Sequence, residues 1–342
     1  MNRLCTLLAA TVLAAGALAP PALAQPAAGA SGLRVVAHIP GPDGGWDYTS
    51  FDPARRRVYV AHGMTVMAID AETGKANPAF AAGNRLHAVV PVPATDRIVT
   101  TNSGDNSAKI ISAVDGRLLA SVTTANDADG AVYDPASGLV LVICGDAGEV
   151  DLIDPKAMKL VGSIKVGDKL EFGAVDGKGR LYVNVEDKNE IAVVDIAARK
   201  ALTRYPLTGC TRPTGLAYVM GARLVAACGS GAAEILDAPT GRDIATLKIG
   251  AFPDAVLYDP HRRIALIPSA ITGTLAVIAL DGKDDNTIVD TVSTQIGART
   301  GAVDPRTGRV YLPSAQYELP APPPGQRPKP KAGTFEVLVL DR

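Results

Sequence analysis

The sequence lacks the short motifs that mark several common enzyme classes. It contains no CxxCH for covalently bound haem, no GxSxG nucleophile elbow, no Walker phosphate loop and no HExxH zinc motif. Tryptophan occurs once and aromatic residues make up 4% of the chain, which argues against a broad carbohydrate-stacking surface. We therefore expect no haem and no nucleotide cofactor.

The sequence also has no excess of positive or negative charge. The 34 basic and 35 acidic residues nearly cancel, so there is no long-range field to gather phosphate backbones or anionic lipid. Nucleic acid is thus disfavoured as a main partner.

An apolar run long enough to remain in a membrane is missing too. The run that follows Arg3 is short and leads to small residues at Ala22 and Ala24, which is the pattern of a cleaved export signal. We predict a signal peptide over residues 1–24, a flexible N-terminus over 25–32, and a periplasmic or secreted protein without a membrane span.

What the sequence does contain is an internal repeat. Units such as "VYVAHGMTVMAIDAETGK" and "RLYVNVEDKNEIAVVDIAARK" join β-branched runs through turns rich in Gly, Pro, Asp and Asn. The end of the second run recurs at intervals of 42, 42, 41, 42, 44 and 60, at Asp70, Ser112, Asp154, Asp195, Asp237, Asp281 and Asp341. A period near 42 with about four strands per unit predicts an all-β, seven-bladed propeller with four-stranded blades.

The two ends of the repeat array complete each other. The chain stops one residue after Asp341, where other units continue into a further strand, and "LRVVAHIP" at 33–40 has the pattern of that strand. Its pairing with the last blade would close the ring and remove an exposed edge. We predict one domain over 33–342, with a Pro-rich loop inserted at about 317–333.

These repeats, "VYVAHG…VMAIDAETGK" most of all, resemble the YVTN/YncE-type β-propellers of exported bacterial proteins. The resemblance covers nearly all of the predicted mature chain. It implies a working face at the end of the channel where the innermost strands begin, and relatives that include binding modules, lactonases and oxidoreductase domains. The single tryptophan departs from quinone-dependent dehydrogenase propellers, so we expect no pyrroloquinoline quinone.

The repeat register places one residue of each unit at that channel mouth. This first ring consists of Asp47, His87, Asp129, Glu171, Thr214, Asp254 and Arg299. Clustered carboxylates repel one another, so a cation, Arg299 or a proton must hold them together.

Two chemical uses of the ring stay open beside that of a hydrated channel mouth. Oxygen ligands with one histidine suit calcium, magnesium or manganese, and less well zinc; the metal-ligand candidates are Asp47, His87, Asp129, Glu171 and Asp254. The catalytic candidates for acid–base work on a small polar substrate are His87, Glu171 and Arg299.

A second ring ends the second strand of each unit. It holds His62, Asn102, Cys144, Val185, Cys228, Ser269 and Ser314. His62 contributes to the ligand pocket or is a solvated turn residue. Trp46 stacks on a ligand or packs between blades. Tyr317, at the start of the Pro-rich loop, could cover the opening.

The cysteines and the Asp-Pro turns have structural interpretations. Antiparallel strands joined near Gly221 bring Cys210 and Cys228 to the same face, which predicts a disulfide, and leaves Cys144 as a buried free thiol. The Asp-Pro pairs lie at hairpin turns, where Asp caps backbone donors. We assign these pairs no chemistry.

Three functions remain open at this point. The first is a monomeric binding propeller that presents the channel mouth to a small molecule, a metal ion or a periplasmic protein. The second is a lactonase-like hydrolase or a lyase that uses the carboxylate, histidine and arginine cluster. The third is a protein–protein scaffold that uses the Pro-rich loop.

Overall fold

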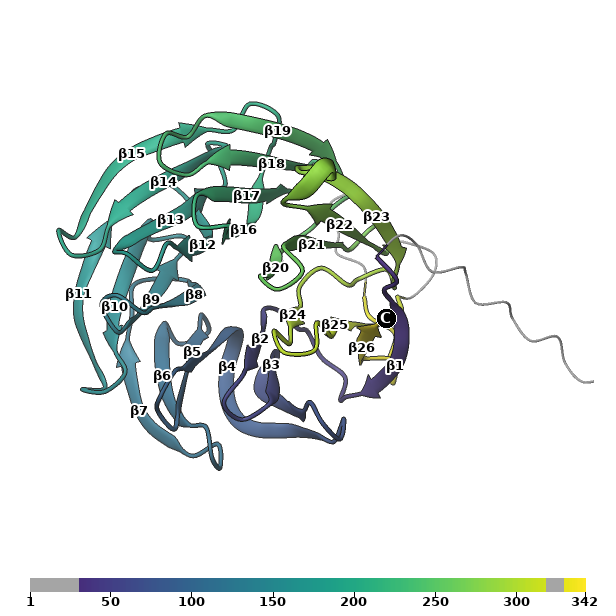
Figure 1. Cartoon of the computed structure of the whole chain (residues 1–342). Coiled ribbons are helices and arrows are strands. Elements are labelled where there is room, and N and C mark those ends of the chain that lie inside the picture. The colour runs from purple at the N-terminus through teal and green to yellow at the C-terminus, as the bar shows by residue number, and fades with distance from the viewer. Residues whose placement is uncertain (1–30, 318–328) are drawn as a thin grey trace, which may run out of the picture.

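The computed structural model describes residues 31–317 and 329–342. Its antiparallel sheets are arranged around a central axis, as in a propeller (Figure 1). The predicted signal peptide and most of the Pro-rich loop lie outside the described residues. No helix among the described residues is long and apolar enough to span a membrane.

The described residues form short strands and one 3-10 turn, η1 (Gly282–Asp284). The strands are β1 (Arg34–Pro40), β2 (Thr49–Asp52), β3 (Arg57–Asp70), β4 (Ala76–Val92), β5 (Arg97–Asn102), β6 (Ser107–Ser112), β7 (Leu118–Thr123), β8 (Ala128–Asp134), β9 (Leu139–Cys144), β10 (Glu149–Asp154), β11 (Lys159–Lys165), β12 (Leu170–Val175), β13 (Arg180–Val185), β14 (Glu190–Asp195), β15 (Lys200–Pro206), β16 (Pro213–Val219), β17 (Arg223–Cys228), β18 (Ala232–Asp237), β19 (Asp243–Lys248), β20 (Leu257–Asp259), β21 (Ile264–Ser269), β22 (Thr274–Ala279), β23 (Thr287–Ser293), β24 (Ala302–Val303), β25 (Val310–Ser314) and β26 (Glu336–Asp341).

The prediction of seven four-stranded blades is wrong. Within residues 31–317 and 329–342 the strands form six hydrogen-bonded sheets, five with four strands and one with six, β2 to β7. Counted by sheets, the protein is a six-bladed propeller with mostly four-stranded blades.

The correction has a local cause in the first two repeat units. β3 pairs first with β2 and then with β4. It folds back on itself near Gly63, because the Ala71 N–H donates to the Arg56 carbonyl at 2.9 Å. β4 runs without a break from its pairing with β3 into its pairing with β5, which begins at Leu86. The two units therefore share one sheet, with register shifts between Gly63 and Thr65 and between Leu86 and Val89.

The predicted ring closure is confirmed. β1 pairs antiparallel with β26, so that Arg34 faces Asp341 and Pro40 faces Glu336. In Figure 1 the purple N-terminal strand lies beside the yellow C-terminal strands. Leu33, just before β1, is 2% exposed and packs in the core between the last sheets.

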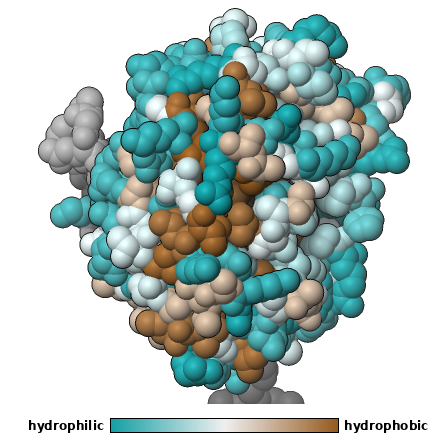
Figure 2. Space-filling model, turned by 90° about the vertical axis from the view of Figure 1, so that its left-hand side faces the viewer, coloured by the Kyte–Doolittle hydropathy of each residue, from teal (hydrophilic) through white to brown (hydrophobic). Residues whose placement is uncertain are grey.

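The core lies between neighbouring sheets, because the middle strands bury both of their faces. β9, for example, is buried at every position after Leu139. The outer strands are half exposed, and Leu118, Leu160 and Leu202 stand 42 residues apart on β7, β11 and β15 with 40–52% of their surface exposed. Figure 2 shows apolar side chains gathered on this flank.

The cysteine predictions are confirmed for the described residues. Cys210 and Cys228 form a disulfide with a Cα–Cα distance of 5.5 Å. Cys144 is a buried free thiol, and burial together with the nearby Asp151 carboxylate raises its pKa. The disulfide favours an oxidising compartment.

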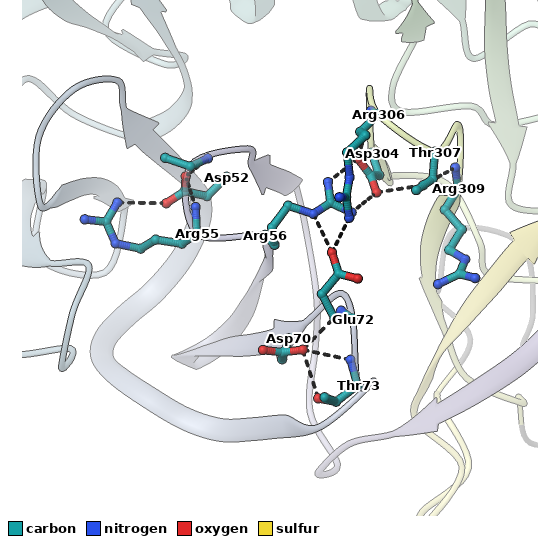
Figure 3. Close-up of polar contacts among 11 residues, drawn as sticks. Asp52, Arg55, Arg56, Asp70, Glu72, Thr73, Asp304, Arg306, Thr307 and Arg309 are labelled. Carbon is teal, nitrogen blue, oxygen red and sulfur yellow. Dashed lines mark hydrogen bonds and ion pairs between the residues drawn. The ribbon is translucent and has the colours of Figure 1, made fainter.

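The Asp-Pro turns have the structural role that the sequence predicted. Asp52, for instance, accepts backbone N–H groups of its own turn from Ala54 and Arg55 at 3.0 and 3.2 Å. Arg56 joins two such turns, because its Nη1 donates to Asp304 at 2.5 Å and its Nε donates to Glu72 at 2.8 Å (Figure 3). The first and last repeat units are thereby tied together at this end of the molecule.

Candidate functional site at the channel mouth

The first-ring residues lie where the innermost strands begin, and β-bulges direct several of them. Asp47 lies just before β2, and its N–H donates to the Ala61 carbonyl at 2.9 Å. Register shifts in the innermost strands include or adjoin four other ring residues, namely His87, Asp129, Glu171 and Thr214. A bulge re-aims a side chain that the regular pleat would point elsewhere.

Three ring residues from three successive repeat units form one compact group. The Nδ1 atom of His87 lies 2.7 Å from Asp47 Oδ2 and 3.2 Å from Asp129 Oδ1. Their side chains are 16–18% exposed, so solvent reaches the group. One ligand atom of each residue lies within 4.8 Å of the others, so this group could hold a metal ion.

The electrostatics of this group favour a shared positive charge. Burial raises the pKa of Asp129 to about 7, with a further contribution from the nearby Asp47 carboxylate. Burial lowers the pKa of His87, but the hydrogen bond to Asp47 and the Asp129 charge outweigh it and raise that pKa overall. A proton on His87 therefore fills the role that a bound cation could take.

The other ring nitrogen of His87 has a partner that the sequence analysis missed. Its Nε2 lies 2.9 Å from the Ser103 Oγ. Ser103 directly follows the second-ring residue Asn102, and only that adjacency in the repeat could have indicated it.

A second omission is Tyr48, whose hydroxyl donates to Glu171 Oε1 at 3.3 Å. Tyr48 is 6% exposed, and its ring packs against Phe172 with centroids 4.6 Å apart. Burial raises the pKa of this hydroxyl, and the carboxylates of Glu171, Asp254, Asp129 and Asp47 raise it further. Four ring acids thus lie around one phenol.

Glu171 is the most strongly perturbed of these acids. Burial raises its pKa to about 10, and the charges of Asp129 and Asp254 contribute. Burial among other carboxylates therefore favours the neutral form of this carboxyl group. Glu171 is not part of the three-residue metal group.

Asp254 and Arg299 form an ion pair, with Arg299 Nε 2.9 Å from Asp254 Oδ2. Burial raises the pKa of Asp254 to about 6, against the lowering effect of Arg299. Arg299 also donates to the Trp46 carbonyl at 2.6 Å and lies 5.6 Å from the centre of the Trp46 ring. Asp254, like Glu171, is outside the metal group.

The remaining predicted site residues are placed as follows. Trp46 is 4% exposed and packs against Phe335, in agreement with packing between blades. His62 is also 4% exposed and contacts the same Phe335 ring, so it is not a solvated turn residue, and burial lowers its pKa. Thr214 donates to the Pro253 carbonyl at 2.8 Å. Tyr317 is partly buried, and Arg299 lowers its pKa against the larger effect of burial, which raises it.

The backbone around the mouth repeats an uncommon conformation. Two positions before a ring residue, the chain has a positive φ at Arg85 (50°), Asp127 (61°), Arg212 (56°), Phe252 (56°) and Gly297 (99°). Residues with side chains rarely adopt this region, at a cost of about 1 kcal/mol or more each. The same conformation occurs in turns away from the mouth, for example at Arg56 and Ala94, so it is a property of the turns of the repeat.

Comparison with known proteins supports the fold alone. A chain of hydrazine synthase from Kuenenia stuttgartiensis has a TM-score of 0.69 at 16% identity, over 80% of this chain and 92% of that one. A chain of a mitotic checkpoint complex has a TM-score of 0.72 at 13% identity, over 97% and 99%. U3-55K has a TM-score of 0.74 at 9% identity, over 90% and 98%.

This chain is a β-propeller. No family model and no curated protein matches the chain. The resemblance to YVTN/YncE-type repeats therefore stays an interpretation of the sequence, and the function has to be argued from the site.

Proposed function

We propose that this protein is an exported binding propeller whose channel mouth takes a divalent metal ion through Asp47, His87 and Asp129. One observation carries the proposal: three potential ligand atoms from three separate repeat units lie within 4.8 Å of one another. His87 Nδ1 contacts both carboxylates there. A divalent cation would relieve their repulsion more fully than a proton does.

The donor set narrows the choice of ion. One imidazole nitrogen and two carboxylates suit manganese or zinc, which accept mixed nitrogen and oxygen ligands. Calcium takes six to eight oxygen ligands and would need most of them from water here. Three protein ligands also leave positions open for a small ligand beside the ion.

Isothermal titration calorimetry of the metal-free protein with manganese, zinc, calcium and magnesium chloride tests this function. We expect Asp129→Asn and Asp47→Asn to weaken manganese or zinc binding by about tenfold or more, since each removes one charged ligand. Asp146→Asn is the matched control, because Asp146 is an exposed acid in a hairpin turn outside the metal group. Equal binding by all three variants would exclude this site.

Proton competition gives a second readout of the same proposal. Because the pKa of Asp129 is raised to about 7 and that of His87 is raised, both groups carry protons that the ion must displace. Affinity should therefore increase from about pH 6 to about pH 8, and protons should be released on binding. An affinity that is independent of pH would contradict these ligands.

The second candidate function is hydrolysis, and the contact between His87 and Ser103 favours it. A Ser103 Oγ attack on an ester or lactone carbonyl would pass the serine proton to His87 Nε2, while Asp47 orients the ring through Nδ1. His87 would return the proton to the leaving oxygen, and water would then cleave the acyl-enzyme. A lactone and ester screen tests it: Ser103→Ala should abolish turnover, and a wild-type protein without turnover would refute it.

A further inference from the structure

A cavity lies beside the channel axis, toward the Asp-Pro turns and away from the acidic mouth. It has a volume of about 350 Å³ and is lined by residues of the innermost strands β2, β20 and β24 and by Pro53 and Pro305 in the turns that follow β2 and β24. In Figure 1 these three strands lie near the centre of the ring. The volume is within the range of about 300–1,000 Å³ that is typical of small-molecule sites. We call this cavity the axial pocket.

The innermost strands are short in the three units that surround the axial pocket. β2, β20 and β24 have four, three and two residues, whereas β8, β12 and β16 have seven, six and seven. Short strands, together with a small residue such as Ala302, leave space beside the axis. Each of the three is also the edge strand of its sheet, so alternate backbone N–H and C=O groups point away from its one neighbour and can bond to a ligand.

The walls of the axial pocket are mainly apolar and include two aromatic rings. Phe51, Tyr258 and Val303 hold the same repeat position, directly before the turn aspartate, and all three are only partly buried. The Arg56 guanidinium lies over the Phe51 ring, 5.0 Å from its centre, and helps to hold the ring in place. A partly exposed wall with two aromatic rings suits a ligand with a flat, apolar body.

Two polar groups of the pocket residues have no partner among the described residues. The Thr49 Oγ1 and the Ser50 Oγ are buried, and neither forms a hydrogen bond there. A buried hydroxyl without a partner costs free energy that a hydrogen bond to a ligand would recover. Because a hydroxyl can donate as well as accept, one oxygen atom on the ligand is sufficient as its partner.

The axial pocket has no charge to offer a ligand. None of the described residues that line it is charged. The turn carboxylates next to its walls are at most 3% exposed, and each contacts an arginine: Asp52 with Arg55 at 3.2 Å, Asp259 with Arg262 at 2.6 Å, and Asp304 with Arg56 at 2.5 Å. A charged ligand would therefore lose its hydration here without gaining an unpaired counter-ion.

We propose that the axial pocket binds a small, uncharged aromatic compound that carries one hydroxyl or carbonyl oxygen. The ring system of this compound packs against Phe51, Tyr258 and Val303. Its oxygen forms a hydrogen bond with the hydroxyl of Thr49 or Ser50. The ligand differs in chemistry from the cation of the channel mouth, because the acids gather at the mouth while the walls of the axial pocket are neutral.

Ligand-observed NMR titrations of the protein at neutral pH test the proposal, with 2-naphthol as the probe. Naphthalene lacks the hydroxyl group and 2-naphthoate carries a negative charge, so these two compounds separate the polar argument from the charge argument. We expect 2-naphthol to bind about tenfold more tightly than 2-naphthoate and about threefold or more tightly than naphthalene. Equal binding of 2-naphthol and either comparison compound would overturn the corresponding argument, and no binding of 2-naphthol would refute the proposal.

Matched variants test the position of the site. Val303→Phe fills the axial pocket and should weaken 2-naphthol binding about tenfold or more. Val175→Phe is the control, because Val175 has the same repeat position in another unit and is not one of the described residues that line the pocket. If the two variants have the same affinity for 2-naphthol, the axial pocket is not the binding site.

Removal of the two hydroxyls gives a readout that does not depend on filling the pocket. Thr49→Val with Ser50→Ala should weaken 2-naphthol binding about threefold or more and leave naphthalene binding unchanged. Because neither hydroxyl has a partner among the described residues, the melting temperature of the ligand-free double variant should equal or exceed that of the wild-type protein. A lower melting temperature, or an unchanged affinity for 2-naphthol, would refute the role of these hydroxyls.

The proposal fails separately from the proposed function. The axial pocket shares no residue with the metal group, so Val303→Phe should keep the calorimetric response to manganese of the wild-type protein. Asp129→Asn should in turn keep the wild-type affinity for 2-naphthol. Loss of 2-naphthol binding in Val303→Phe with metal binding intact supports both proposals. Metal binding by a wild-type protein that does not bind 2-naphthol would refute this one alone.

Discussion

The two ends of the propeller use the same residue type in opposite ways. At the Asp-Pro turns, Asp304 accepts hydrogen bonds from Arg56, Thr307 and the Arg306 backbone. Burial raises its pKa, but these donors outweigh burial and lower the pKa to about 2. At the channel mouth, Asp129 has other carboxylates as neighbours, and burial raises its pKa to about 7.

The difference shows where the protein has negative charge that is not fully neutralised by its own groups. Turn aspartates are neutralised by donors from their own loop and the adjoining arginines, so a ligand would gain little there. The acids at the mouth have other carboxylates as neighbours and fewer compensating donors. An added cation could therefore stabilise their charges. Local hydrogen bonding, more than amino-acid type, separates a structural aspartate from a functional one.

Breaking the turn network should have the largest effect. Asp304→Ala would leave the Arg56 guanidinium without its main partner, because the Asp304 side chain that it contacts is removed. That side chain is 1% exposed. We expect a loss of about 3–5 kcal/mol in the free energy of unfolding, measured with urea. Arg306→Ala is the control, since its side chain is 61% exposed and should cost less than about 1 kcal/mol. Equal losses would remove the distinction between the buried and exposed members of this network.

Removing a mouth acid should have the opposite sign. Asp129→Asn keeps the shape of the side chain and deletes a charge that burial and Asp47 disfavour. In the absence of metal we expect it to stabilise the protein by about 1–3 kcal/mol near pH 8, and by less near pH 5. A destabilised variant near pH 8 would mean that Asp129 is needed to hold the fold together.

The pH dependence of the metal-free protein sharpens the contrast. The pKa values of Asp129 and Asp254 are raised to about 7 and about 6, so between about pH 4 and pH 7 the native state binds more protons than the unfolded state. Stability should therefore fall as the pH rises through this range. The lowered pKa of Asp304 acts below about pH 4 and leaves the range unaffected. Thermal melts should show the decline, and manganese should offset it near pH 8; a melting temperature that rises toward pH 8 would contradict the mouth electrostatics.

The smallest expected effect concerns the phenol among the mouth acids. Tyr48→Phe removes the hydrogen bond to Glu171 and keeps the ring that packs on Phe172. We expect a change of about 0.5–1.5 kcal/mol in stability. Urea unfolding at neutral pH measures it, with Tyr218→Phe as a control at an exposed hydroxyl. A loss as large as that of Asp304→Ala would show that the mouth is a structural network like the turns.

Periodicity predicted the features that depend on repeated spacing. It placed β1 against the last sheet, paired Cys210 with Cys228, and placed His87 beside Asp47 and Asp129 although they lie far apart in the chain. These predictions succeed because equivalent positions in a closed array face a common axis.

Features that depend on one repeat alone were not predictable in this way. The long strand β4 joins two units into one sheet, because it runs without a break from its pairing with β3 to its pairing with β5. Ser103 and Tyr48 have no equivalents that mark them in other units, so only coordinates reveal their contacts with His87 and Glu171.

The antiparallel pairing of β1 with β26 has a consequence for folding. Arg34 pairs with Asp341, so the ring closes only after β26 has been synthesised. Contacts of such sequence separation are slow to form because the loop between them must first lose its entropy. The earlier sheets can assemble as an open arc. Pairing of β26 with β1 then converts this arc into a closed ring.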